Sequence, residues 1–266
     1  MGWLGARGLL VCRVSSLCRF AMRFTFLRAA LAFAALAGCA APAPPPQVPP
    51  PGAAGAELPA DERAALRTAA MRAADNFVSV VERVEPVAER VCRERTEGVD
   101  CDFRIYVDDR PGVPPNAFQT IDPRGGPAIV FSLALIADAR NQDELAFVLG
   151  HEAAHHIEGH IPRSQASAEL GALVLGGLAE VTGQGPERVD AALRLGAAVG
   201  SRRYAREFEL EADALGTVIA HRAGYDPVRG AEFFARIPDP GDRFLGTHPP
   251  NAERVALVRR VAASLP

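Results

Sequence analysis

Apolar residues recur at helical spacing over most of the chain beyond residue 60, and alternation of apolar and polar positions is confined to a short middle stretch. The first helical run covers 61–91 and has Asp61 and Glu62 in its first turn, where acidic side chains stabilise a helix. Pro86 lies inside this run. Because proline lacks a backbone N–H, we expect Pro86 to kink or end the helix.

The alternating stretch predicts a small sheet. Residues 103–108 alternate and are rich in aromatic and β-branched side chains, which is typical of a strand. Two further strand-like runs fill 115–131 and flank a cluster of turn-forming residues at 122–126. These two runs therefore predict a hairpin.

Helical spacing returns after the hairpin and continues to the end of the chain. Ser132 and Asn141 are suitable N-caps for helices over 132–139 and 141–160. The Ala-, Gly- and Leu-rich stretch 165–200 predicts helices buried in protein, because acidic and arginine residues interrupt it and argue against a membrane span. Further helices are expected over 201–222, 228–236 and 250–264. The predicted fold class is therefore α+β, mainly helical, with a small sheet or hairpin.

The N-terminal segment has the form of a secretory signal. Arg23 and Arg28 precede an apolar stretch over 29–37, which is followed by small residues. A membrane-spanning helix needs about 20 apolar residues, so this stretch is too short for one. Its end, Leu36–Cys39, resembles the lipobox of bacterial lipoproteins.

That resemblance divides the chain into a signal peptide over 1–38, a lipidated proline-rich tether over 39–60 and a folded domain over 61–266, with Met22 as an alternative start. It implies that Cys39 carries the lipid. The tether has the composition of an extended spacer, and a partner-binding polyproline motif is the alternative. Alanine rather than aspartate follows the cysteine. We therefore expect a lipoprotein at the periplasmic face of the outer membrane in the bacterial cell envelope.

Composition and charge exclude several classes of protein. The chain has 266 residues, of which 48% are hydrophobic and 23% are charged, as in an ordinary globular protein rather than a disordered chain or a collagen. The formal charge is −3, and residues 1–38 carry five arginines and no acidic residue. Removing these five positive charges leaves −8 for the remainder. An acidic mature chain argues against nucleic acid as a partner.

The five cysteines fit an oxidising compartment. Cys12 and Cys18 precede the alternative start, and Cys39 is the expected lipid site. Cys92 and Cys101 remain, nine residues apart. In the cell envelope a local disulfide between them is the default expectation, and a metal site is the weaker alternative because no histidine is near in sequence.

A metal-binding motif occupies the centre of the chain. His151 and His155 are four residues apart, so on a helix their imidazoles project from one face at the spacing that suits two ligands of one Zn²⁺. Glu152 lies beside them, within reach of a metal-bound water. The alternative is an exposed helix face. Four of the six histidines fall within ten residues, which makes that alternative weak.

A catalytic zinc needs a third protein ligand and an open position. The candidates are four acidic residues that crowd the helix predicted over 201–222, namely Glu207, Glu209, Glu211 and Asp213. Glu209 and Asp213 are four residues apart and share a face, so one can bind metal while the other holds an imidazole N–H.

Several motifs occur together in one order: HExxH at 151–155, ExEADxxG at 209–216, AGYDP at 223–227 and THPP at 247–250. This order resembles the HtpX and CAAX prenyl protease family of zinc metallopeptidases, and is closest to its soluble envelope lipoprotein members. The resemblance covers about residues 75–262 and implies a zincin-like domain with an active-site helix that carries HExxH.

The resemblance also implies roles for individual residues. One Zn²⁺ per chain would be bound by His151, His155 and Glu209, and Asp213 would orient a ligand histidine. Glu211 is the alternative to Glu209 as ligand, and Glu207 is expected to be a solvated acid.

Two further residues carry implied roles near the metal. His248 matches a histidine that either caps the metal at rest or contacts the oxyanion, with a structural role as the alternative. Arg254 is either an oxyanion helper or an internal salt-bridge residue. His156 and His160 form a second pair four residues apart, for which a second metal site is a weak alternative, and His160 can also cap the helix end. His221 is expected to be structural.

The segment Asn116, Ala117 and Phe118 matches a strand that borders the cleft in relatives and pairs with an extended substrate. An edge strand binds peptides through main-chain hydrogen bonds with little demand on sequence. A purely structural strand is the alternative reading of these residues.

These features predict a zinc-dependent endopeptidase in which Glu152 is the general base. The family and the location imply that its substrates are unfolded or misfolded polypeptides of the cell envelope. A latent protease that acts mainly as a periplasmic chaperone or assembly factor is the main alternative. A zinc-storage or sensor protein and a prenyl protease are weaker ones. The expected partners are therefore unfolded polypeptides and, through the lipid anchor, a membrane.

Overall fold

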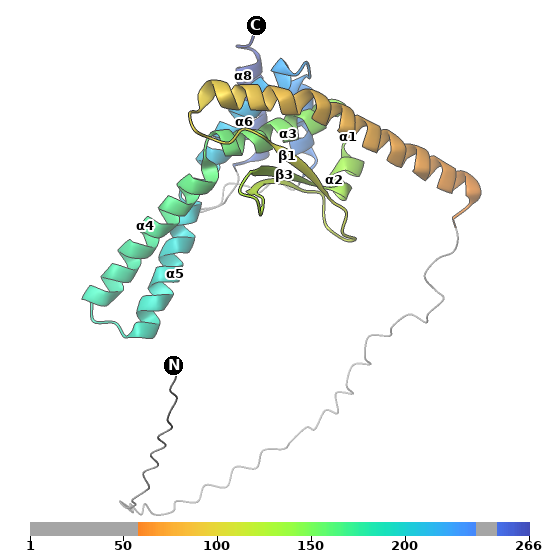
Figure 1. Ribbon diagram of the computed structural model, residues 1–266. Coiled ribbons are helices and arrows are strands. Elements are labelled where there is room, and N and C mark those ends of the chain that lie inside the picture. The colour runs from red at the N-terminus through yellow and green to blue at the C-terminus, as the bar shows by residue number, and fades with distance from the viewer. Residues whose placement is uncertain (1–57, 238–248) are drawn as a thin grey trace, which may run out of the picture. The chain divides into compact units, whose positions relative to one another are not determined.

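The computed structural model describes residues 58–237 and 249–266, which belong to one compact unit. The described part is mainly helical with a small three-stranded sheet, which confirms the predicted fold class (Figure 1). In chain order the elements are α1 (Ala60–Arg95), β1 (Arg104–Asp108), β2 (Ala117–Ile121), β3 (Pro127–Ser132), α2 (Leu133–Asp138), α3 (Gln142–Ile157), α4 (His160–Val181), α5 (Pro186–Arg202), α6 (Ala205–Arg222), α7 (Pro227–Gly230), the 3₁₀ helix η1 (Ala231–Ala235) and α8 (Asn251–Ala262).

The sequence predicts that Pro86 kinks or ends the first helix, but α1 continues through Pro86 to Arg95, so the helix does not end there. A proline inside a helix costs about 3 kcal/mol. Burying one valine side chain is favourable by about 1.5–3 kcal/mol, and several apolar side chains are buried on both sides of Pro86. Packing against the core therefore outweighs the local cost. The buried residues of α1 are Phe77, Val80, Val84, Val87, Ala88, Val91 and Cys92.

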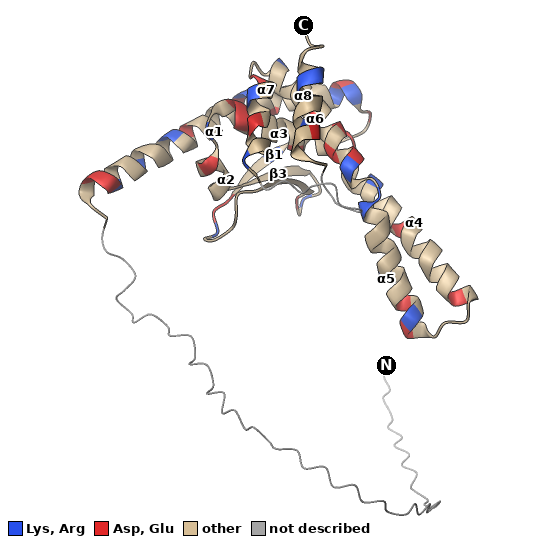
Figure 2. Ribbon diagram, turned by 180° about the vertical axis from the view of Figure 1, so that it is seen from behind, with Lys and Arg blue, Asp and Glu red and all other residues tan. Residues whose placement is uncertain are grey.

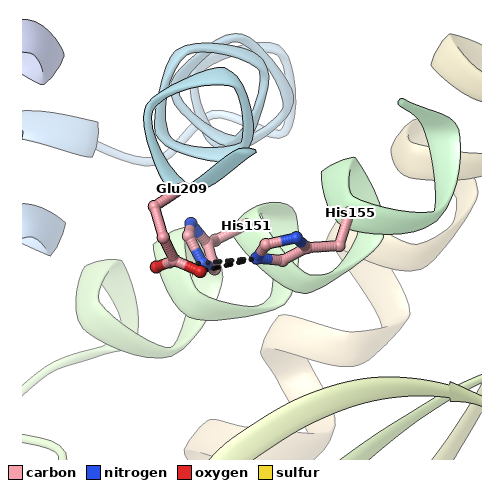
Figure 3. Close-up of side chains that lie close together, drawn as sticks. All are labelled: His151, His155 and Glu209. Carbon is pink, nitrogen blue, oxygen red and sulfur yellow. Dashed lines mark hydrogen bonds and ion pairs between the residues drawn. The ribbon is translucent and has the colours of Figure 1, made fainter. Parts of the chain in front are cut away.

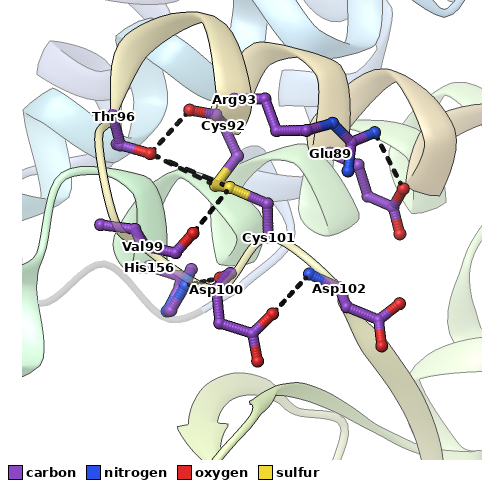
Figure 4. The surroundings of a disulfide bond; sticks show 9 residues. All are labelled: Glu89, Cys92, Arg93, Thr96, Val99, Asp100, Cys101, Asp102 and His156. Carbon is purple, nitrogen blue, oxygen red and sulfur yellow. Dashed lines mark hydrogen bonds and ion pairs between the residues drawn. A yellow bond between two sulfur atoms is a disulfide. The ribbon is translucent and has the colours of Figure 1, made fainter.

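A disulfide joins the end of α1 to the segment that leads into β1. Cys92 and Cys101, the predicted pair, are bonded and have Cα atoms 5.8 Å apart (Figure 4). Both cysteines are buried in the main hydrophobic core. The cross-link therefore fixes the start of the sheet against α1.

The sheet has the strand order β1-β3-β2, in which β1 is parallel and β2 antiparallel to β3. This arrangement confirms the predicted strand and hairpin. The hairpin turn is held by Asp122, whose side chain accepts hydrogen bonds from the backbone N–H groups of Arg124 and Gly126. The central strand β3 is almost entirely buried, whereas β2 is an edge strand with Phe118 exposed.

Helices α3 and α6 cross in the centre of the molecule. A Cβ atom on Gly150 of α3 would lie 2.9 Å from the carbonyl oxygen of Gly216 on α6, so the two backbones touch there. Helices α1 and α8 and the strands β2 and β3 pack around this pair. The crossing therefore fixes how residues on α3 face residues on α6.

Helix α3 ends at Ile157 and α4 begins at His160, so the single helix predicted over 141–160 is too long. The break lies at Gly159, which has a φ of 66° in the left-handed region that glycine adopts without strain. His160 therefore starts a new helix, and the expected pair of His156 and His160 on one helix face does not form.

Helices α4 and α5 form a long hairpin that projects from the rest of the described chain (Figures 1 and 2). Glycines on its inner face bring the two helices together, and the apolar side chains of the outer face are exposed. The prediction that 165–200 is buried in protein is therefore wrong. None of the described helices combines the length and the apolar character that a membrane crossing requires. The exposed apolar residues of the hairpin are Leu170, Leu173, Val174, Leu178, Val181, Leu193, Leu195 and Val199.

The remaining helices close over α3 and α6. The helix predicted over 228–236 is divided into α7 and η1, and the one predicted from 201 begins at Ala205. Asp226 caps α7 by accepting hydrogen bonds from two backbone N–H groups. Arg236, just after η1, binds the buried carboxylate of Glu144 at the start of α3. This ion pair ties the C-terminal region to the helix that carries the HExxH motif.

Candidate metal centre

Two nitrogen donors project from helix α3. Asn141 caps this helix, because its side chain accepts a hydrogen bond from the backbone N–H of Glu144. His151 and His155 lie one turn apart, and their Nε2 atoms point to the same place, 3.0 Å from each other (Figure 3). The structure thus brings together the two imidazoles that the motif spacing predicts as ligands.

Helix α6 supplies an oxygen donor, Glu209. Its Oε1 lies 3.4 Å from Nε2 of His155, and its Oε2 lies 3.7 Å from Nε2 of His151 (Figure 3). In a tetrahedral site with ligand distances of about 2.0–2.1 Å, neighbouring ligand atoms lie about 3.3 Å apart. The three donors therefore have the spacing and the chemistry to hold one metal ion, and two histidines with a glutamate are a set found in catalytic zinc sites.

Asp213, one turn beyond Glu209 on α6, orients His151. The Nδ1–H of His151 donates to Oδ1 of Asp213 over 2.9 Å, which leaves the Nε2 lone pair facing the other donors. Burial lowers the pKa of His151, but the hydrogen bond and charge of Asp213 outweigh burial and raise it. A cation at the three donors would oppose that rise and keep the ring neutral.

Arg254 of α8 binds Asp213 from the other side. Its Nε and Nη2 donate to the two carboxylate oxygens of Asp213, each over 2.7 Å. Its Nη2 also lies 3.3 Å from Oε2 of Glu209, and the guanidinium stacks over the ring of Phe234 at 3.8 Å. Burial raises the pKa of the Asp213 carboxyl, but Arg254 and His151 together hold it below its usual value. The geometry thus favours the internal salt bridge over the oxyanion role that the sequence left open for Arg254.

Glu152 is placed differently from the other carboxylates of the site. It is buried, directly follows His151 on α3 and lines a cavity together with His151, His155 and Glu209. Among the described residues it makes no hydrogen bond or ion pair. A carboxylate in this position can accept a proton from a water molecule in the cavity.

The donors open into a cavity of about 820 Å³. One wall is formed by the start of β2, so that Asn116, Ala117 and Phe118 all line the cavity. The free edge of β2 faces away from β3, because β2 pairs only with that strand within the described sheet. The opposite walls come from the base of the α4–α5 hairpin and from α8, including Ile161, Ser201 and Arg254. An extended chain can therefore reach both the donors and a strand edge.

A contact that the sequence did not predict lies on the far side of His155. Nδ1 of His160 lies 2.8 Å from Nδ1 of His155, and Nε2 of His160 lies 2.9 Å from Oε2 of Glu211. Arg163 binds the same carboxylate oxygen over 2.6 Å. Burial lowers the pKa of His160 to about 4, although the hydrogen bond to Glu211 opposes this shift. Gly159 turns His160 back toward His155, and a glycine at this position signals that a helix can end there but not that it does.

The other predicted residues lie away from this cluster or outside the described ranges. His248 lies outside them, as do Cys39 and the expected signal peptide. His156 bonds a backbone carbonyl near the disulfide (Figure 4), and His221 bonds a carbonyl at the end of the chain. Glu207 is exposed.

Two curated proteins are among the relatives that this chain resembles in sequence. The mitochondrial metalloendopeptidase OMA1 of Saccharomyces cerevisiae is 29% identical over 168 residues, which cover 58% of this chain and 45% of that protein. A beta-barrel assembly-enhancing protease of Vibrio cholerae is 30% identical over 157 residues, which cover 53% of this chain and 32% of that protein. The chain thus spans less than half the length of these relatives.

The model of peptidase family M48 matches residues 77–262, which include the three candidate metal donors, Glu152 and Asp213. The match covers more than half of the chain and confirms the family that the order of motifs indicated. The chain therefore belongs to peptidase family M48.

Proposed function

We propose that this chain is a zinc-dependent endopeptidase that hydrolyses peptide bonds of misfolded or unassembled proteins in the bacterial cell envelope. The observation that carries the proposal is the placement of Glu152. Its buried carboxylate lies next to three donors with the spacing of a catalytic zinc site, in a cavity bordered by a strand edge. Membership of peptidase family M48 supports the metalloprotease activity.

Each residue of the site has a defined task in peptide hydrolysis. His151, His155 and Glu209 would hold zinc, which when bound supplies a Lewis acid that acidifies water and polarises a peptide carbonyl. Glu152 takes the proton from the attacking water and later delivers it to the leaving amine. Asp213 keeps the ring of His151 in the orientation and tautomer that the ligand role requires.

The cavity supports an extended peptide as substrate. The free edge of β2 offers backbone donors and acceptors beside the donor cluster, so a substrate can pair with it as an added strand. Such pairing demands an unfolded segment but little sequence specificity, which suits a protease that acts on misfolded proteins. The name of the Vibrio cholerae relative supports a place in the bacterial envelope, and the lipobox resemblance at Cys39 supports anchoring at the outer membrane.

Cleavage of casein by the zinc-loaded full chain tests the proposal. We expect cleavage by the wild-type protein and a loss of about 10²–10⁴-fold in rate for Glu152→Gln, because this substitution removes the general base and keeps the side-chain volume. Zinc affinity should stay unchanged, because Glu152 is not among the donors. The matched control is Glu158→Gln, which alters a glutamate at the end of the same helix that pairs with Arg95 outside the cavity.

Two outcomes would contradict this assignment. Full cleavage by Glu152→Gln would show that another group is the base. Absence of cleavage by both proteins, with zinc bound, would favour the latent protease that acts as a chaperone. That alternative predicts that wild type and Glu152→Gln prevent the aggregation of an unfolded envelope protein equally well.

A further inference from the structure

The two histidines of the donor cluster, His151 and His155, differ in how firmly their neighbours hold their rings. His151 lies in the middle of α3 and bonds directly to the carboxylate of Asp213. His155 lies two residues before the end of α3, and its side chain is more exposed, at 17% against 9% for His151. A ligand near a helix end needs another group to fix its ring.

That group is the imidazole of His160. The two rings meet edge to face, with centroids 4.9 Å apart and an angle of 74° between their planes. Their Nδ1 atoms are 2.8 Å apart, so one nitrogen donates a proton to the other. The opposite nitrogen of His155, Nε2, is the atom that faces His151 and Glu209.

The direction of this hydrogen bond follows from Glu211. The carboxylate of Glu211 is ion-paired with Arg163 and can only accept, so Nε2 of His160 must donate to it. A neutral His160 then has its lone pair on Nδ1 and accepts the Nδ1–H of His155. The lone pair of His155 is left on Nε2, which points at the donor cluster. The reverse arrangement would direct a lone pair of His160 at a carboxylate, which is repulsive.

His160 itself is held firmly. Its ring is buried and stacks on Phe208 of α6, with centroids 4.5 Å apart and an angle of 12° between the planes. Arg163 covers the same Phe208 ring at 4.4 Å while it binds Glu211. The ring of His160 is thus fixed by two residues of α6: it stacks on Phe208 and forms a hydrogen bond with the carboxylate of Glu211.

We propose that His160, fixed by Glu211, is a positioning residue that orients the imidazole of His155 toward the metal. Both histidine donors then depend on a carboxylate of α6, His151 directly through Asp213 and His155 through His160. This inference rests on the proposed zinc site. Neither His160 nor Glu211 contacts the substrate in this assignment, and their effect is exerted through His155.

Zinc affinity of the full chain, measured by competition with a chelator, tests the inference without relying on activity. His160→Phe retains the volume and the stacking on Phe208 but removes the acceptor. We expect zinc affinity to fall about 10–100-fold, the usual effect of losing a partner that orients a ligand. The visible spectrum of the Co²⁺-substituted protein should change as well, because the geometry around the metal is altered.

Rescue and control variants distinguish a loss of orientation of the His155 ring from a loss of packing around His160. His160→Asn places an amide oxygen near the position of Nδ1 and should restore most of the affinity. Glu211→Gln weakens the hold on His160 and should cause a smaller loss. The matched control is His156→Phe, which alters the neighbouring histidine of α3 that bonds a carbonyl away from the cluster, and it should leave zinc affinity unchanged.

The possible failures are distinguishable. If wild type binds no zinc, the proposed function fails. If wild type binds zinc and folded His160→Phe binds it equally well with the same Co²⁺ spectrum, the positioning role is wrong and the metal site stands. If His160→Phe does not fold, His160→Asn decides: a folded His160→Asn with affinity reduced about 10–100-fold would overturn the role, because the acceptor is still present.

Discussion

The α3–α6 pair and the α4–α5 pair both have close backbone contacts at glycine residues. The first pair is enclosed by other elements, whereas the second is largely exposed. In the α3–α6 pair, a Cβ atom on Gly216 would lie 2.8 Å from the backbone nitrogen of His151. In the α4–α5 pair, Cβ atoms on Gly171, Gly196 or Gly200 would each overlap a backbone carbonyl of the partner helix. In both pairs the helices are therefore so close together that any residue larger than glycine at these positions would push them apart.

The surroundings of the two pairs differ. Side chains of α3 and α6 are buried on most sides by α1, by the sheet and by α8, whereas α4 and α5 contact chiefly each other and expose apolar side chains on their outer faces. The residues that bear chemistry, His151 and Glu209 among them, lie on the enclosed pair. Glycine contact alone therefore does not define a site. The same contact sets the positions of metal donors only where the rest of the fold holds both helices.

The largest difference in cleavage rate between the two helix pairs is expected when alanine replaces a glycine at the crossing of each pair. Gly216→Ala should push α6 away from α3 and cost about 1–3 kcal/mol of unfolding free energy through overpacking. Because Glu209 moves with α6, cleavage of casein should fall about 100-fold, as expected for a displacement near 1 Å. Gly196→Ala has a closer clash, of the new Cβ with the carbonyl oxygen of Gly171 on the partner helix, but it should leave cleavage within about twofold of wild type.

Thermal unfolding and cleavage rates of the two variants give the measurement. Gly177→Ala serves as a control for helix propensity, because a Cβ there meets nothing within 4 Å, and it should stabilise by about 0.5–1 kcal/mol. A loss of cleavage in Gly196→Ala equal to that of Gly216→Ala would show that the hairpin also positions the donors.

Removal of zinc should affect the enclosed pair alone. A metal that binds only the folded state stabilises it by about 4 kcal/mol when its free concentration is about 1,000 times Kd. The chelated protein should therefore unfold at a lower temperature, and its amide hydrogens in α3 and α6 should exchange faster. Amides near the tip of the α4–α5 hairpin should exchange at the same rate with and without zinc. Faster amide exchange in both helix pairs after zinc removal would contradict the expectation that zinc stabilises α3 and α6 alone.

The parts of the site that could be predicted from the sequence are those set by spacing along one helix. Four-residue spacing places His151 and His155 on one face whatever surrounds the helix, and the same rule pairs Glu209 with Asp213. The sheet was also predictable, because alternation and the turn residues at 122–126 are local signals.

The parts that could not be predicted depend on contacts between distant residues. Gly159 can sit inside a helix or end it, and here its left-handed conformation goes with the contacts of His160 to His155 and Glu211. Pro86 is tolerated because of core packing by α1, which the local pattern does not contain. The Ala-, Gly- and Leu-rich stretch 165–200 has the same composition whether its outer face is covered or exposed, so its exposure could be learned only from the structure.

The smallest effect on the unfolding free energy is expected from substitutions on the outer face of the α4–α5 hairpin. Leu173 is 69% exposed, so Leu173→Gln should change the unfolding free energy by no more than about 0.5 kcal/mol. Leu193 is the matched comparison: it is 37% exposed, and the rest of its side chain packs against Gly176 of the partner helix. Leu193→Gln removes part of the apolar contact between the two helices and should cost more, about 1 kcal/mol. Urea unfolding of both variants measures the difference, and equal losses would mean that the outer face of the hairpin is covered in solution.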